Sequence, residues 1–332
     1  MSPRLILAAL CLLSIFAFRV DPVDAQAATP TPPPACPVDF DGFLPPRLIP
    51  GEAARVLTTP LNFRPAPTTT LARLDQLRPA TLVDVTGTPA CNEGYVWWPV
   101  TVDGVDGWLA EGNPVEETYY LEPRGALITL EGDDGIPRQF VRQDDDRLEP
   151  AGCMRPPDDY SRVQLDYATL NRRTVFMLEN ASRIYRAFGG IYDFRDLLVQ
   201  GSYNAGVVEA SFGTHDGGGA VDLSVRSRAD WSVMWGEIPY MIEALRVAGF
   251  AAWVRETGEL YPNSPIHIHA IAVGDADLSP AARAQIDGER GYLRGYNGLP
   301  ESYGPPIPDA WGEPVICAWM IADGFPDLRE SE

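Results

Sequence analysis

The chain has 332 residues and a formal net charge of −20, from 46 acidic and 26 basic side chains. This length is enough for two domains of ordinary size. The acidic excess excludes proteins that bind nucleic acid through a basic surface, because phosphate contacts need clustered lysine and arginine. Anionic cell-wall polymers would be repelled too, so attachment to a wall would have to rely on shape and hydrogen bonds.

The N-terminus is typical of a secretory signal peptide, which we place at residues 1–27. A basic residue precedes an apolar run from Leu5 to Phe18, and Ala25 and Ala27 supply small residues for cleavage. The run is short for a membrane span, and no later segment approaches span length. We therefore expect an exported protein with no membrane span in its mature chain. An uncleaved N-terminal anchor is the alternative.

Five cysteines occur in the chain, and removal of the signal peptide takes Cys11 and leaves four. An even number of cysteines in an exported chain favours disulfide bonds. Four cysteines allow three pairings, and the sequence alone does not choose among them. We favour Cys36–Cys91 and Cys153–Cys317, because each pair then lies within one predicted domain. A cysteine zinc site is disfavoured, since no C-x-x-C pair is present.

A proline-rich stretch, ATPTPPPACP, opens residues 28–50, which we interpret as a semi-rigid spacer. From residue 51 to 123, short β-rich runs alternate with Pro, Asn and Gly clusters at the spacing of a small barrel. The runs are ARVLTT, TLVDVTG, YVWWPVTV and GWLAEG. Neighbouring residues of a strand face opposite sides. We therefore expect one of Trp97 and Trp98 to lie in the core and the other to be exposed.

Three of these motifs resemble bacterial SH3-like domains: LNFRPAPTTT resembles the L-N-V-R-x-G-P-S loop, and EGYVWWPV and GWLAEG resemble the central and closing strands. The resemblance implies that residues 51–123 form a small all-β barrel, of a kind that commonly attaches exported enzymes to cell-wall peptides. Residues 124–150 are predicted to follow as a hydrophilic linker, with one added strand at 126–130. Asp144, Asp145 and Asp146 lack the spacing of a calcium loop, so we interpret them as solvated.

Residues 151–332 combine helical and β patterns and predict an α+β domain. One helix is expected at 168–188, where a Gly-Gly pair ends it, and another at 237–250. A third is expected to begin with Ser279 as N-cap and Pro280 as its first residue. Strands are expected at DLLVQGSY, AVDLSV, FAAWVRE and IHIHAIAVG. These would form an antiparallel sheet with helices packed on one face and polar motifs on the other.

All three histidines fall in two short stretches, SFGTHDGGGAVD at residues 211–222 and IHIHA at residues 266–270. His215 precedes Asp222 in a Gly-rich segment, and in a strand His267 and His269 share one face. Two imidazoles and a carboxylate, with an open fourth position, are the usual ligands of a catalytic zinc. The pattern therefore predicts a Zn²⁺ centre. Ordinary polar residues on a sheet face are the alternative.

H-x6-D followed by H-x-H resembles the zinc peptidases that include D-Ala-D-Ala carboxypeptidases, lysostaphin-type endopeptidases and the hedgehog fold. The wider carboxypeptidase pattern, S-x-H-x-x-G-x-A-x-D, is matched except at its serine, which is Gly213 here. The resemblance covers roughly residues 150–332 and implies that His215, Asp222 and His269 are the zinc ligands. It also implies that His267 is the catalytic residue that positions or deprotonates the zinc-bound water, because this chain lacks the glutamate used by other members.

A second departure concerns the arginine of the family's S-G-Y-R motif, which steadies negative oxygens of the substrate. This chain has QGSYNAG at residues 200–206, with Asn204 near the arginine position. Arg255 and Arg195 are the candidates to replace it. Asp216 and Glu256 are candidates to orient the imidazoles, but we expect them to be exposed.

These features together predict a secreted zinc metallopeptidase that acts on peptidoglycan peptides and most resembles a D-Ala-D-Ala carboxypeptidase. Its zinc would activate a water and polarise the scissile carbonyl, while a neighbouring base moves the proton. An endopeptidase or amidase on the same scaffold, and a non-catalytic wall-binding protein with a structural zinc site, are the alternatives. A serine hydrolase is disfavoured, because the chain has no G-x-S-x-G motif. The expected location is extracellular or cell-wall associated.

Overall fold

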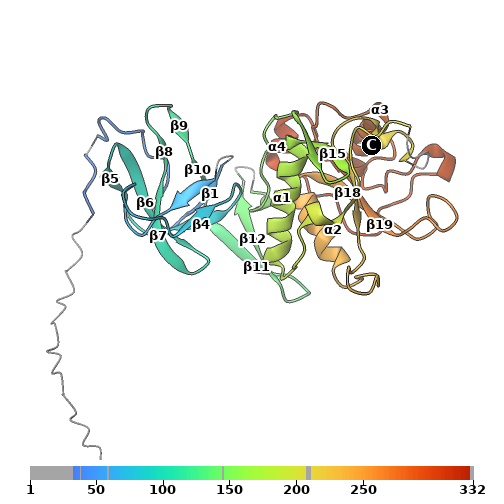
Figure 1. Cartoon of the computed structure of the whole chain (residues 1–332), viewed down its shortest axis with the longest axis horizontal. Helices are drawn as coiled ribbons and strands as arrows, with labels where there is room; N and C mark the ends of the chain where they lie inside the picture. The colour runs from blue at the N-terminus through green and yellow to red at the C-terminus, as the bar shows by residue number, and fades with distance from the viewer. Residues whose placement is uncertain (1–32, 38, 58–59, 144–145, 207–210, 330–332) are drawn as a thin grey trace, which may run out of the picture. The chain divides into compact units, whose positions relative to one another are not determined.

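The computed structural model describes residues 33–329, except residues 38, 58–59, 144–145 and 207–210 (Figure 1). The predicted signal peptide, most of the proline-rich stretch, and Asp144 and Asp145 lie outside the described residues. The described chain is mostly β, with few helices and open sheets, which is compatible with the predicted α+β arrangement. None of its helices has the length and apolar character needed to cross a membrane.

Residues 53–125 form short antiparallel strands, as the alternating β-rich runs predicted. The largest sheet has the order β10-β1-β4-β6-β5, with β7 paired to β6, and two small two-stranded sheets, β2-β3 and β8-β9, accompany it. A closed SH3-like barrel stays a prediction. The bounds are β1 Ala53–Val56, β2 Leu61–Phe63, β3 Asp75–Leu77, β4 Leu82–Val85, β5 Ala90–Asn92, β6 Tyr95–Val102, β7 Val105–Ala110, β8 Gly112–Asn113, β9 Thr118–Tyr119 and β10 Leu121–Gly125.

Trp97 and Trp98 on β6 are both buried, at 2% and 3% exposure, so the prediction that one of them is exposed is wrong. Trp98 lies in the hydrophobic cluster of this half, and its Nε1 donates to Oε2 of Glu111 at 2.7 Å. Trp97 faces the other side, where its Nε1 donates to the carbonyl oxygen of Asn92 at 3.1 Å and its ring packs against Tyr95. Both faces of the sheet are covered at this point.

The predicted hydrophilic linker contains a three-stranded antiparallel sheet. Its strands are β11 Leu127–Glu131, β12 Pro137–Arg142 and β13 Leu148–Pro150. β11 confirms the strand expected at 126–130, whereas the rest of the segment was wrongly expected to be irregular. Charged turns separate the strands and most of their side chains remain accessible to water, so the composition resembles that of a linker. The role of this segment as a domain boundary stays a prediction.

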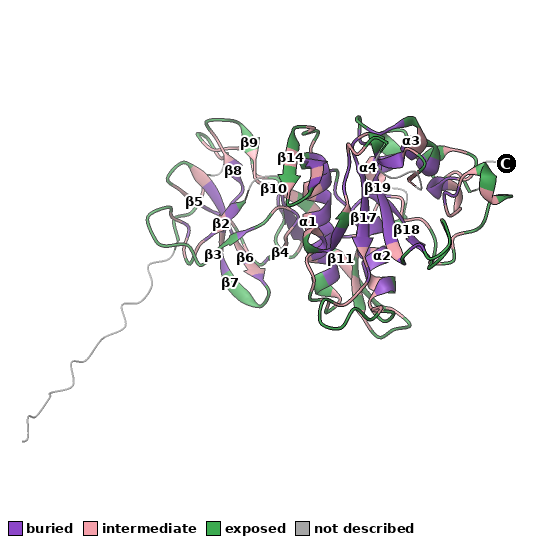
Figure 2. Cartoon of the chain, turned by 45° about the vertical axis from the view of Figure 1, so that its right-hand side comes forward, coloured by how far each residue is buried: buried purple, intermediate pink, exposed green. Residues whose placement is uncertain are grey.

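The polar motifs lie on a four-stranded antiparallel sheet of order β16-β17-β19-β18. The sequence predicted this sheet and its four strands. Figure 2 shows β17, β18 and β19 buried along most of their length. The bounds are β16 Leu198–Gln200, β17 Ala220–Ser224, β18 Phe250–Arg255 and β19 His267–Ala272, preceded in the chain by the hairpin of β14 Arg162–Leu165 and β15 Ala168–Asn171.

Four α-helices accompany this sheet in the described residues: α1 Arg172–Ala187, α2 Ile238–Val247, α3 Pro280–Asp287 and α4 Ala318–Ala322. α1 begins four residues later than predicted. The side chain of Asn171 accepts a hydrogen bond from the backbone N–H of Thr174 and so starts the helix, while residues 168–171 pair as β15. α3 begins as predicted, since the side chain of Ser279 caps it and Pro280 is its first residue.

Strand alternation separates an apolar face from a polar face. Val221, Leu223 and Ile268 belong to the hydrophobic cluster that includes buried residues of α1 and α2, and these two helices pack against each other (Figure 1). The side chains between them on β17 and β19 point the other way. The fold therefore uses one face of the sheet for the core and leaves the other for the polar motifs.

Two disulfides join Cys36 to Cys91 and Cys153 to Cys317, which confirms the favoured pairing. The Cα–Cα distances are 4.6 Å and 5.7 Å, within the range that disulfides require. The second bridge ties the residue before α4 back to the start of the segment that carries the sheet.

Candidate metal centre

Strand register brings the polar side chains together on one face. In the antiparallel pairing of β17 with β19, Asp222 lies opposite His269. On the other side of β19, His269 lies opposite Trp253 and His267 opposite Arg255 of β18. Residues directly opposite each other in a sheet have Cβ atoms about 5 Å apart. Backbone pairing alone therefore brings Asp222 and His269, which are 47 residues apart in the sequence, into contact.

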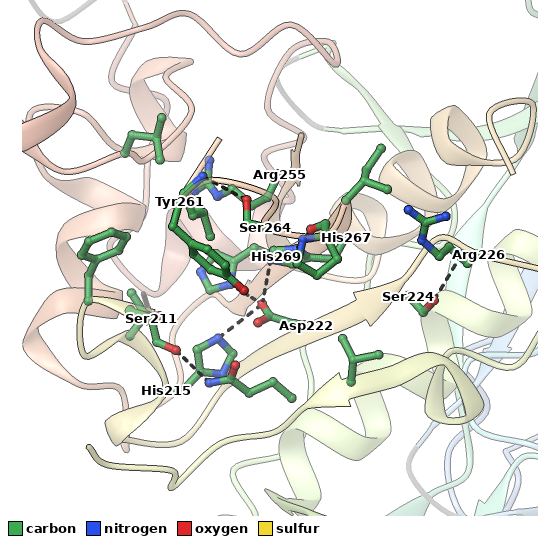
Figure 3. Close-up of a pocket in the computed structure, with 18 of the residues that line it drawn as sticks. Ser211, His215, Asp222, Ser224, Arg226, Arg255, Tyr261, Ser264, His267 and His269 are labelled. Atoms are coloured by element: carbon green, nitrogen blue, oxygen red, sulfur yellow. Dashed lines mark hydrogen bonds and ion pairs between the residues drawn. The ribbon is translucent and has the colours of Figure 1, made fainter. Parts of the chain in front are cut away.

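His215 reaches this face from the 3₁₀ turn η3, Thr214–Asp216 (Figure 3). Gly213, the residue before this turn, has φ of 77°, a left-handed conformation that favours glycine over serine. This geometry accounts for the departure from the carboxypeptidase pattern at that position. The turn places the imidazole over β17, where it is 1% exposed.

Three ligand atoms converge at this point. Nε2 of His215 lies 3.3 Å from Oδ1 of Asp222, and Nδ1 of His269 lies 2.7 Å from the same oxygen. All three atoms lie within 4.8 Å of one another, and all three residues are buried. The structure thus brings together the three residues that the sequence predicted as ligands.

The far nitrogen of each imidazole contacts an oxygen that can only accept a hydrogen bond. Nδ1 of His215 is 2.9 Å from the carbonyl oxygen of Gly201, and Nε2 of His269 is 3.0 Å from Oε1 of Gln285. These two ring nitrogens therefore carry the proton in the neutral tautomers. In these tautomers Nε2 of His215 and Nδ1 of His269 direct lone pairs at the carboxylate, whereas a proton on either nitrogen would make it a hydrogen-bond donor to Asp222.

Two lone pairs that face a carboxylate oxygen repel it unless a cation lies between them. A tetrahedral zinc with bonds of about 2.0–2.1 Å would separate its ligand atoms by about 3.3 Å. The separation of His215 from Asp222 equals this value, whereas Nδ1 of His269, at 2.7 Å from the same oxygen, would have to move outward. Two imidazole nitrogens and one carboxylate oxygen also form a donor set that zinc prefers. The side chains present therefore fit this metal.

Burial and mutual contact shift the pKa values of the cluster. Burial would raise the pKa of Asp222, but the His215 and His269 imidazoles hold it well below its usual value. Burial lowers the pKa of His269 to about 4. Burial also opposes protonation of His215, yet the Asp222 carboxylate outweighs it and raises the pKa of this histidine. Asp222 is thus ionised and His269 neutral at pH 7, as metal ligands must be.

Protons should compete with zinc mainly at His215, whose pKa is the raised one. We expect the logarithm of the zinc affinity to rise with pH by about one unit per pH unit below that pKa, since binding then releases one proton. The slope should rise clearly above one only near pH 4, where His269 is about half protonated, and approach two below that pH. Competition with a chromophoric chelator between pH 4.5 and 7.5 measures the slope. A slope of two across this whole range would contradict the assignment.

His267 lies beside the cluster without belonging to it. Its Nδ1 is 2.9 Å from the carbonyl oxygen of Pro265, which fixes the proton on that nitrogen. Its Nε2 is 3.8 Å from Oδ1 of Asp222, and the side chain is 12% exposed. An imidazole nitrogen that is free of other hydrogen bonds and directed at the ligand group is placed to accept a proton there.

The cluster lies in a cavity of about 520 Å³. Figure 3 shows His215, Asp222, His267 and His269 gathered on the strand face. Three partly exposed aromatic side chains also line the cavity: Phe212, Trp231 and Tyr261. Apolar walls with a few convergent polar groups are typical of small-molecule sites.

Gly217, Gly218 and Gly219 allow close packing of the turn before β17. A Cβ on Gly217 would collide with the carbonyl oxygen of Asp277, and one on Gly218 would lie 2.8 Å from the Cβ of Asp277. Gly219 has φ of +77° and packs against Leu278. The glycines therefore let the turn before β17 lie directly against residues 275–279.

Of the two candidate arginines, only Arg255 lines the cavity. Arg195 instead forms ion pairs with Asp193 and Glu179 at 2.8 Å and 2.5 Å. Asn204 does not line the cavity, and its backbone N–H donates to the carbonyl oxygen of His215. Asp216 and Glu256 are exposed, as expected.

Sequence reasoning missed Gln285 of α3 and Trp253 of β18. The Trp253 ring stacks on the His269 ring at a centroid distance of 6.0 Å and an interplanar angle of 14°. Trp253 covers a face of the His269 ring and Gln285 contacts its edge at Nε2, and both contacts restrict the orientation of the ring. Only strand register could have indicated Trp253, which stands opposite His269, and no local pattern marks Gln285.

A second group of facing ligand atoms occurs at Glu149, Cys153 and Cys317. Its two cysteines form a disulfide, so neither offers a thiolate. Oε1 of Glu149 accepts the backbone N–H of Ala318 at 2.6 Å. This group has no free ligands for a metal, which leaves the histidine cluster as the candidate centre in the described residues.

Replacement of Gln285 by leucine should weaken zinc binding about 10- to 100-fold, because His269 loses the acceptor that fixes its tautomer. Gln285→Glu keeps an acceptor oxygen at the same position and should retain most of the affinity. Competition titration against a chelator measures both variants. Equal weakening in the two, or none in Gln285→Leu, would contradict this role.

No protein-family model matches this chain, and neither does any curated protein or solved structure. The functional assignment therefore rests on the geometry described above.

Proposed function

We propose that this protein is a secreted zinc-dependent peptidase that cleaves peptidoglycan peptides in the manner of a D-Ala-D-Ala carboxypeptidase. The observation that carries the proposal is the convergence of His215, Asp222 and His269 in the lining of a cavity, with their ligand atoms within 4.8 Å of one another. Catalytic zinc sites combine three such ligands with an accessible fourth position.

His215, Asp222 and His269 would hold the zinc, which when bound would supply a water of lowered pKa and polarise the scissile carbonyl. Nε2 of His267 accepts the proton of the attacking water and returns it to the leaving amine. The carbonyl oxygen of Pro265 keeps the other ring nitrogen protonated, so that the accepting nitrogen faces the ligand group. Trp253 and Gln285 keep His269 fixed during the reaction.

Two features support export and wall targeting. The two disulfides favour an oxidising compartment. The short antiparallel strands between residues 53 and 125 suit an SH3-like module that binds cell-wall peptides. Zinc peptidase and wall-binding module would then form the two domains of the mature chain.

One observation favours the non-catalytic alternative. Nε2 of His267 lies 3.8 Å from Oδ1 of Asp222, so a rotation of its ring would bring a fourth protein ligand to the metal. A zinc closed by four protein ligands is structural, and the protein would then be a wall-binding module.

Purified muropeptides distinguish these functions. The zinc-loaded protein should release D-alanine from pentapeptide fragments, as detected by mass spectrometry, and a chelator should abolish the release until zinc is restored. A cut inside the peptide would identify an endopeptidase, and separation of peptide from glycan an amidase. Zinc binding without any of these products would overturn the peptidase proposal in favour of the structural one.

A further inference from the structure

Arg255 is a buried cation whose guanidinium forms no hydrogen bond or ion pair with the described residues, although it lies over the Trp253 ring and the Glu259 carboxylate acts on it from farther away. It ends β18 and is 2% exposed, and no described side chain or carbonyl accepts a hydrogen bond from its Nη1. Arg246 is buried to the same extent, but it donates to four backbone carbonyl groups and to Asp309. Burying an unpaired charge costs free energy, and the binding of a group of opposite charge offsets this cost. Arg255 therefore differs from a structural arginine.

The position of Arg255 directs it to the candidate metal centre. It lies opposite His267 in the register of β18 with β19, on the face that carries His269 and Trp253. Its guanidinium lies 5.4 Å from the centroid of the Trp253 ring, the ring that stacks on His269. Figure 3 draws Arg255 among the residues that line the cavity. The free donor is thus available to a ligand in the cavity.

The expected ligand is a single carboxylate. Guanidinium binds carboxylate with two parallel hydrogen bonds. A phosphate dianion would meet only one other arginine in the cavity lining of the described residues, Arg226, together with the negative charges of Asp222 and Glu259. The acidic surroundings therefore favour a monoanion.

The strand geometry also indicates which carboxylate. Arg255 is one strand further from β17 than the ligand His269 of β19, and neighbouring strands lie about 4.8 Å apart. Successive residues of a peptide are about 3.8 Å apart. A peptide whose scissile carbonyl meets the ligand group would thus place the carboxylate of the next residue towards β18.

We propose that Arg255 binds the C-terminal carboxylate of the substrate, so that the site selects peptides that end one residue after the scissile bond. This inference rests on the proposed peptidase function and narrows it to removal of a single C-terminal residue. Arg255 would then act from β18, in place of an arginine before the first histidine motif.

The test compares N-acetyl-D-alanyl-D-alanine with its C-terminal amide by isothermal titration calorimetry. The protein is the zinc-loaded mature chain carrying His267→Ala, which should slow turnover about 10²- to 10⁴-fold, and the measurement is repeated after zinc removal. We expect the free acid to bind about 10- to 100-fold more tightly than the amide. Adding Arg255→Met should reduce this preference to less than about threefold. Arg255→Lys keeps the positive charge but loses the paired N–H groups of the guanidinium, so it should leave an intermediate preference.

Arg195→Gln is the matched control, because Arg195 lies outside the cavity lining, and it should keep the full preference. Equal binding of acid and amide by the unsubstituted Arg255 protein, binding of neither, or a preference that persists in Arg255→Met would each overturn the inference. A failure of the peptidase proposal alone would give another result. The protein would still prefer the acid to the amide through Arg255, but it would cleave no muropeptide.

Discussion

Replacement of His269 by alanine is expected to abolish zinc binding, whereas the unsubstituted mature protein should hold about one zinc ion per chain. His269 supplies the ligand atom closest to Asp222, at 2.7 Å. Loss of a residue that merely orients a ligand costs about 10- to 100-fold in metal affinity, so loss of the ligand itself should cost at least about 100-fold. Elemental mass spectrometry of the dialysed proteins measures the zinc content directly.

Glu149→Gln is the matched control, since Glu149 belongs to the other group of facing ligand atoms, whose cysteines are bridged. It should retain the full zinc content. Zinc in His269→Ala at the level of the unsubstituted protein would place the metal elsewhere. Absence of zinc from the unsubstituted protein, even when zinc is offered during refolding, would refute the metal centre.

The candidate site could be predicted from the sequence because its geometry follows from backbone periodicity. Side chains two residues apart on a strand share a face, so His267 and His269 had to point the same way. The apolar residues between the ligands, such as Val221 and Ile268, had to enter the core. The pairing of β17 with β19 places Asp222 opposite His269, and the turn before β17 adds His215 to the group.

The parts that escaped prediction depend on contacts between distant segments. Gln285 meets His269 only because α3 packs beside the strand face. Trp97 is buried because both faces of its sheet are covered, whereas alternation alone suggests one open face. The predicted linker forms strands because β12 pairs on both sides, although its composition favours solvent. None of these contacts leaves a periodic pattern in the local sequence.

Arg255 is a further example of a feature that the sequence pattern alone does not reveal. The sequence offered Arg255 and Arg195 as the two candidates and gave no reason to prefer either. The structure separates them by their partners: Arg195 has two carboxylates, and the buried Nη1 of Arg255 has none among the described residues. Burial and hydrogen bonding, which the sequence does not report, decide which arginine is available to a substrate.

His267→Ala is expected to lower kcat by about 10²- to 10⁴-fold while leaving the zinc content unchanged. The residue is not one of the three converging ligands, so its loss should spare the metal. Its Nε2 is the free imidazole nitrogen on the cavity side of the cluster, because Nδ1 is engaged by Pro265. Removal therefore takes away the proton acceptor and leaves substrate binding, and hence KM, nearly unaltered.

His267→Gln sharpens this test, because its side-chain amide can accept a hydrogen bond but cannot take up a proton. If His267 acts as a base, both variants should lose activity to a similar degree and keep their zinc. If it only positions the water, His267→Gln should recover much of the rate. Loss of zinc together with activity in both variants would identify His267 as a fourth ligand, and the centre would then be structural.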